Sequence, residues 1–142
     1  MKREHFSVTA IPAGNTPDAP DVPTLRVDYS GSVAVLRDRL TDGDGATLES
    51  ADVDVAFRKR EGETGVVSIA KRLTGAFIVE LDAETTAVQR VVDVAEADDG
   101  RYRVEIVTGD DRVRFEKQTL LVYDTTGQLL RSSSLIPGSV EL

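Results

Sequence analysis

Apolar and polar residues alternate along much of this chain, and a period of two is typical of β-strands with one buried face. The clearest case is the set Val53, Val55 and Phe57, which alternates with residues that include Asp54 and Arg58. Glycine- and aspartate-rich turns separate the alternating segments and predict tight reversals between them. The pattern predicts strands over residues 5–10, 25–29, 53–58, 66–71, 76–81, 102–107, 112–116, 120–123 and 128–131.

Two segments depart from this period. Residues 83–97 show helical spacing, and Asp82 in front of them is predicted to cap the helix N-terminus. Residues 33–40 fit two patterns, because their apolar residues share a helical face while every second residue also fits one side of a strand. A strand or a short helical turn is predicted there. The apolar stripe of the 83–97 helix consists of Val88, Val91, Val92 and Ala95.

The hairpin over residues 102–116 specifies its own register. A turn at residues 108–111 places apolar residues opposite each other on the core side and opposite charges opposite each other on the outer side. One register therefore satisfies both kinds of pair at once, which is how register is normally set. The four pairs are Val104–Phe115, Ile106–Val113, Arg103–Glu116 and Glu105–Arg114.

The spacing of these elements predicts an α+β fold. It consists of a mostly antiparallel β-sheet of about seven or eight strands, with the helix at about 83–97 packed on a face. Four of the five prolines lie within residues 11–23, so that segment is predicted to be an extended loop. A length of 142 residues suits a single domain over residues 1–142.

The balance of charged residues indicates the solvent in which the protein works, and it does not indicate a reaction that the protein performs. The formal net charge is −8, cysteine is absent, aspartate exceeds glutamate, and arginine exceeds lysine. In molar salt the Debye length falls to ~3 Å, so such a surface repels itself very little and still keeps the protein soluble. The bias indicates a protein adapted to a salt-rich cytosol.

Charge and hydropathy also limit the partners. The acidic balance disfavours nucleic acid, because binding to phosphates requires a basic face. The sequence has no apolar run long enough to span a membrane, and residues 1–6 do not resemble a secretion signal. We therefore expect a cytoplasmic protein that contacts no membrane.

Distinctive strings occur at residues 23–29, 52–58 and 72–80, and at residues 120–142 with Tyr123-Asp124 and Ser134-Leu135-Ile136-Pro137. These stretches resemble a family of small acidic haloarchaeal proteins with no assigned function. The resemblance implies a haloarchaeal source and a single-domain architecture, and it implies no catalytic or binding residues.

Catalytic constellations are missing from the sequence. His5 is the only histidine and lies in a predicted strand, so a triad in its usual form is nearly excluded. The acidic turn that begins at Asp42 fails as a calcium loop, because Ala46 and Thr47 occupy positions that require an oxygen ligand and a glycine. We predict no catalytic residue, metal or cofactor, which favours a non-catalytic protein over an enzyme.

Two further sets of residues carry alternative hypotheses. Four arginines on the outer face of the 102–116 hairpin are the candidates for binding nucleic acid. The glutamates interleaved with them favour a ladder of ion pairs instead. Three residues at hairpin ends are the first candidates for a small molecule or substrate held between sheet and helix. The arginines are Arg101, Arg103, Arg112 and Arg114, and the ligand candidates are Arg72, Tyr123 and Asp124.

The apolar C-terminal end carries the leading hypothesis. Packed on its own sheet, it completes the core; left exposed, it forms a surface suited to a second copy of the chain or to another protein. The sequence therefore favours a non-catalytic protein-interaction or homo-oligomerising domain. The residues proposed for this contact are Leu129, Leu130, Leu135, Ile136, Val140 and Leu142.

Overall fold

The computed structural model describes residues 6–11, 22–42, 44–97, 100–109 and 111–136. His5 and most of the proline-rich segment at 11–23 lie outside these residues. The strands are β1 (Phe6–Ile11), β2 (Thr24–Tyr29), β3 (Val53–Lys59), β4 (Thr64–Lys71), β5 (Phe77–Glu84), β6 (Tyr102–Thr108), β7 (Asp111–Lys117) and β8 (Leu121–Tyr123). The α-helices are α1 (Val33–Arg39) and α2 (Thr85–Glu96), and two short 3-10 helices are η2 (Ser50–Asp52) and η3 (Arg131–Ser133).

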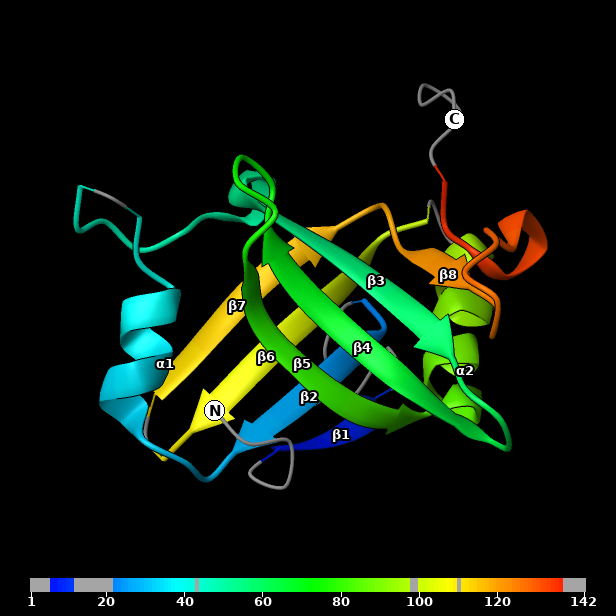
Figure 1. Cartoon of the computed structure of the whole chain (residues 1–142), viewed down its shortest axis with the longest axis horizontal. Coiled ribbons are helices and arrows are strands. Elements are labelled where there is room, and N and C mark those ends of the chain that lie inside the picture. The colour runs from blue at the N-terminus through cyan, green and yellow to red at the C-terminus, as the bar shows by residue number, and fades with distance from the viewer. Residues whose placement is uncertain (1–5, 12–21, 43, 98–99, 110, 137–142) are drawn as a thin grey trace.

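The eight strands of the described part form two four-stranded sheets rather than one. We call β5-β4-β3-β8 the front sheet and β1-β2-β6-β7 the back sheet, as they lie in Figure 1. Most neighbours are antiparallel, but β2 pairs with β6 and β3 pairs with β8 in parallel. The α+β fold class is confirmed. The parallel pairs connect strands that are far apart in sequence, and the same long-range pairing divides the strands between two sheets. Local spacing of residues could therefore reveal neither feature.

The two sheets pack face to face around one hydrophobic core, and Figure 1 shows the strands of the front sheet crossing those behind. Residues with alternating burial supply the inner faces, as in β3, where Val53, Val55 and Phe57 are buried. Helix α2 adds its stripe to the same core, with Val92 and Ala95 fully buried. Helices α1 and α2 lie at opposite ends of the sheets in this view.

Helix α2 begins two residues later than predicted, and Asp82 does not cap it. Strand β5 continues to Glu84, because Glu84 pairs with Thr64 on β4. Asp82 is therefore a strand residue, and its carboxylate lies 3.7 Å from the guanidinium of Arg60. The helix ends as expected near Gly100, which has φ 72° and donates its backbone N–H to the carbonyl of Ala95 at 2.7 Å.

The ambiguous segment at 33–40 is a helix. The Ser32 hydroxyl accepts a hydrogen bond from the backbone N–H of Val35, which satisfies one donor of the first turn. Leu36 is the one buried residue within α1, and Leu40 behind it is also buried. Helical spacing places both on one side of the segment, so the core selects the helix.

The predicted register of the β6–β7 hairpin is confirmed in all four of its pairs. The outer face of this hairpin is less exposed than expected, because Glu105 is only 7% exposed. Two arginines cover its carboxylate: Arg112 Nη1 lies 3.3 Å from Oε1, and Arg114 Nε lies 3.1 Å from Oε2. A charged residue this buried requires such partners.

Candidate functional site

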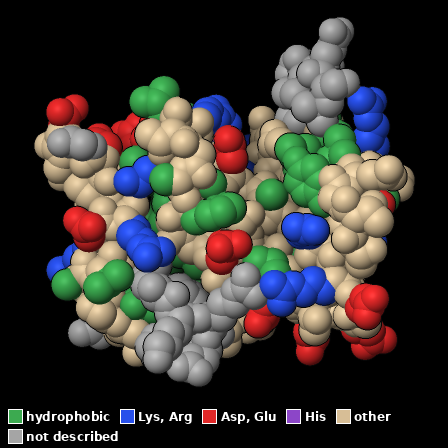
Figure 2. All heavy atoms as spheres, viewed as in Figure 1, with side chains coloured by type: hydrophobic (Ala, Val, Ile, Leu, Met, Phe, Trp, Pro, Cys, Tyr) green, Lys and Arg blue, Asp and Glu red, His purple; other side chains and the backbone are tan. Residues whose placement is uncertain are grey.

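The outer face of the front sheet is hollowed into an open groove of about 750 Å³. Strand register places its residues in rows across the sheet. Arg58 on β3 lies between Val66 on β4 and Tyr123 on β8. In the next row Ala56 pairs with Ser68, which pairs in turn with Glu80 on β5. The floor is therefore built from small or short side chains, and Figure 2 shows charged and apolar groups mixed on this face.

Positive charge gathers at one end of the groove. Arg58, Lys59 and Arg60 line it in succession, and Glu61 follows them, so three cations stand beside one carboxylate. Arg60 is paired with Asp82, but Arg58 and Lys59 make no hydrogen bond or ion pair to any described residue. The other end carries Phe77, whose side chain is 57% exposed.

A second hollow of about 440 Å³ lies at the tip of the β4–β5 hairpin. Leu73 borders it and is 97% exposed, the highest exposure among the large apolar side chains of the described residues. Both signs of charge line the same hollow. The charged residues are Asp42, Asp44, Asp52, Lys71 and Arg72.

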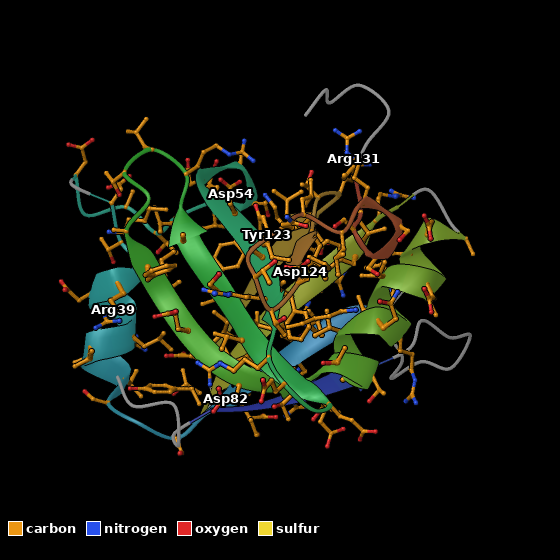
Figure 3. All side chains as sticks on the ribbon, turned by 45° about the vertical axis from the view of Figure 1, so that its right-hand side comes forward. Arg39, Asp54, Asp82, Tyr123, Asp124 and Arg131 are labelled. Atoms are coloured by element: carbon orange, nitrogen blue, oxygen red, sulfur yellow. The ribbon has the colours of Figure 1, made fainter. Side chains whose placement is uncertain are left out.

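The three predicted ligand residues do not form one site. Tyr123 lines the groove, and Arg72 lines the hairpin hollow, where its guanidinium holds Asp54 at 2.9 Å. Figure 3 shows Asp54 at one end of the front sheet, with Tyr123 and Asp124 further along β8 and its turn. Both cavities border strands or turns of the front sheet, and neither is lined by α1 or α2.

Asp124 organises its own turn. Its Oδ1 accepts hydrogen bonds from the hydroxyl of Thr126 at 2.7 Å and from the backbone N–H groups of Thr126 and Gln128 at 2.8 and 2.9 Å. The Thr126 hydroxyl is the largest cause that lowers the pKa of this carboxyl below its ordinary value, followed by the backbone of Gln128. These contacts stabilise the reversal after β8.

The apolar C-terminal residues divide between core and surface. Leu135 is 4% exposed and forms an antiparallel bridge with Leu120, with N–O distances of 3.0 and 2.9 Å. Leu129, Leu130 and Ile136 are half-buried. Val140 and Leu142 lie outside the described residues.

The arginines of the back sheet are held by carboxylates. Arg103 pairs with Glu116 at 2.5 Å, and Arg112 and Arg114 share Glu105. Arg101 also has an interaction partner. Arg103, Arg112 and Arg114 thus form the predicted ladder of cross-strand ion pairs.

No group of three or more His, Asp or Glu side chains is placed to hold a metal ion in the described part of the chain. Neither of its two α-helices has the length and apolar character needed to cross a membrane.

The fold and these surfaces define an α+β protein with two crossed mixed sheets and an open groove on the outer face of one of them. The chain belongs to a family of unknown function, DUF5793, whose model matches residues 1–142. No significant match was found among the curated proteins or among the solved structures.

Neither cavity was predicted from the sequence, although signals for each were present. Residues 58–60, Arg-Lys-Arg, are the one place where three basic residues stand in succession. Leu73 is an apolar residue within a predicted turn, where polar residues are usual. What could not be read locally is that Tyr123, sixty-five positions after Arg58, lies beside it in the sheet.

Proposed function

We propose that this chain is a non-catalytic protein-interaction domain that associates with a second copy of itself through the tip of the β4–β5 hairpin. The observation that carries the proposal is Leu73, which is 97% exposed beside a hollow of about 440 Å³. Fully burying a leucine side chain contributes ~1.5–3 kcal/mol. In a two-fold dimer both copies bury theirs, so this contribution is made twice.

The charges around the hollow suit a contact between identical surfaces. A two-fold interface is self-complementary, so a residue on one side of the axis meets a different residue of the other copy. Asp44 of one copy can then lie near Lys71 or Arg72 of the other, and the opposite signs favour this orientation over a displaced one.

The hairpin tip is favoured over the C-terminal end as the contact surface. Leu135 is part of the core, and Leu129, Leu130 and Ile136 are already half-covered by their own chain. Leu73 offers more apolar surface that only another molecule can cover.

The proposed setting is the cytoplasm of a halophilic archaeon. The net charge of −8 and the excess of aspartate and arginine support it. At molar salt, long-range repulsion between two acidic copies is screened, while burial of Leu73 is not weakened. The proposal therefore places self-association under salt-rich conditions.

The test is the mass in solution at molar KCl, measured by sedimentation equilibrium over a range of concentrations. We expect a dimer for the unaltered chain and a dissociation constant at least ~10-fold weaker for Leu73→Ser. Val94→Ser is the matched control, because Val94 is also an exposed apolar residue, on α2 at 38%. A chain that stays monomeric at every concentration, or equal weakening by both substitutions, contradicts the proposal.

A further inference from the structure

We propose, independently of the dimer contact, that the cationic end of the front-sheet groove binds a nucleoside phosphate. The groove is about 750 Å³, within the ~300–1,000 Å³ typical of small-molecule sites. Three features of the groove support this assignment: two cations without ion-pair partners among the described residues, a neighbouring aromatic ring, and an acidic residue on the opposite wall.

Arg58 and Lys59 differ from most of the described arginines in having no carboxylate partner among the described residues. Seven of the twelve described arginines are within ion-pair distance of a carboxylate: Arg26, Arg37, Arg60, Arg72, Arg103, Arg112 and Arg114. Arg39 donates to the carbonyl of Ile78 instead, and Arg90 on α2 has no carboxylate partner among the described residues and lines neither cavity. Arg58 and Lys59 form no such pair with the described residues, although the whole chain carries an excess of acidic groups. Two cations left together at a concave surface attract an anion. A guanidinium binds phosphate oxygens through two parallel N–H donors, and an ammonium adds a point charge.

The aromatic ring is placed beside these cations by the sheet. Tyr123 on β8 is directly paired with Arg58 on β3, and both line the groove. Tyr123 is half-buried, so part of its ring is accessible, and the Thr125 hydroxyl follows on the same rim. Aromatic rings and guanidinium planes stack on nucleobases, each stacked base contributing ~1–3 kcal/mol.

Glu80, on the wall of the groove opposite the cations, determines how the ligand is oriented. Glu80 lies one row away, across Ser68 and Ala56. A phosphate is repelled from that carboxylate, whereas ribose hydroxyls and base amino groups can donate hydrogen bonds to it. The phosphate is therefore assigned to Arg58 and Lys59, and the nucleoside to the floor between Tyr123 and Glu80.

Phosphate and base occur both in free nucleotides and in single-stranded nucleic acid, so the probes must separate these sources. Binding of ATP, AMP, adenosine, inorganic phosphate and a short single-stranded oligoadenylate is measured by isothermal titration calorimetry. The KCl concentration is the lowest that keeps the chain folded by circular dichroism. Tighter binding of mononucleotide than of oligoadenylate per site assigns the free nucleotide, and the reverse assigns the strand.

Matched variants locate the site. We expect Arg58→Gln and Tyr123→Ala each to weaken nucleotide binding at least ~10-fold, since each removes one of the two main recognition contacts. Arg90→Gln is the control, because it removes an exposed arginine of α2 with the same change in net charge. Lys59→Gln provides a further variant should one of the others fail to fold.

Three results would overturn the proposal. They are no saturable nucleotide binding at millimolar concentration, inorganic phosphate binding as tightly as ATP, and equal weakening by Arg90→Gln and Arg58→Gln. The Leu73→Ser chain is expected to bind nucleotide normally. Failure of the dimer proposal and failure of the nucleotide proposal are therefore separate outcomes.

Discussion

The ammonium group of Lys117 donates a hydrogen bond to the backbone carbonyl of Val53 at 2.7 Å and so joins the two sheets from within. Lys117 ends β7 of the back sheet, and Val53 begins β3 of the front sheet. The same ammonium also donates to the carbonyl of Ser50 at 2.8 Å, and the Ser50 hydroxyl accepts the backbone N–H of Glu116. Lys117 is 8% exposed, so this link is shielded from solvent.

Replacing Lys117 with methionine is expected to lower the free energy of unfolding by ~1–3 kcal/mol, because the buried carbonyl of Val53 and the partly buried carbonyl of Ser50 lose their charged donor. The lost desolvation cost of the ammonium offsets part of this effect. Denaturant unfolding at constant KCl measures the change. Lys71→Met is the control, since Lys71 makes one longer hydrogen bond of 3.4 Å, to Thr41, and the expected effect is smaller. An equal decrease in the free energy of unfolding for Lys71→Met would show that the contacts of Lys117 between the sheets stabilise the fold no more than an ordinary lysine hydrogen bond.

Lys117 also predicts how stability responds to rising pH. Burial lowers the pKa of its ammonium below the ordinary 10.5, with Arg72 contributing and Asp54 opposing. Between the lowered pKa and 10.5 the unfolded chain binds more protons than the folded one, so this residue makes stability rise with pH. The rise is expected to be absent from Lys117→Met when denaturant midpoints are compared across this pH window.

Tyr102 acts in the opposite direction at higher pH. It is fully buried, its hydroxyl donates to the carbonyl of Thr119 at 2.7 Å, and burial followed by the Asp54 charge raises its pKa well above 10.0. The unfolded chain ionises this phenol near pH 10.0 and the folded chain does not, so stability is lost as pH rises above that value. Tyr102→Phe should show a shallower alkaline loss, and an unchanged slope would contradict this assignment.

Asp124 is expected to make the stability of the folded chain depend on pH in the acidic range. Its lowered pKa means that the carboxylate stabilises the folded chain above its ordinary pKa of 3.8, and this contribution disappears as pH falls through the lowered value. NMR titration of the side-chain carboxyl measures it directly. Thr126→Val removes the largest cause and should return the pKa of Asp124 toward 3.8, because the hydroxyl donor is lost. No movement of that pKa would assign the shift to the backbone donors instead.

The charge balance predicts salt-dependent stability. With a net charge of −8, removing KCl lengthens the Debye length from ~3 Å at molar salt to ~30 Å at 10 mM, and carboxylate repulsion then acts across the surface. We expect the free energy of unfolding to rise steadily with KCl in circular dichroism melts. A full native circular dichroism signal and an unchanged free energy of unfolding without salt would contradict the interpretation that the acidic residues are an adaptation to high salt.

Local patterns were sufficient where neighbours in sequence are also neighbours in space. The β6–β7 register follows from pairing Val104 with Phe115 and Arg103 with Glu116, because a short turn leaves few alternatives. The buried stripe of α2 follows from helical spacing. The start of α2 was misplaced because Glu84 still pairs with Thr64 on β4, a partner twenty residues earlier.

By itself the sequence determined the class of fold, most strand positions, the outward charged pairs of one hairpin and the acidic surface. These depend on side-chain periodicity and composition, which are local or additive properties. Tertiary structure alone decided the division into two sheets, the burial of Lys117 against Val53, and the meeting of Arg58 with Tyr123. The physical reason is that parallel pairing and sheet packing bring distant residues together according to the shape and burial of the whole core, which no short window of residues contains.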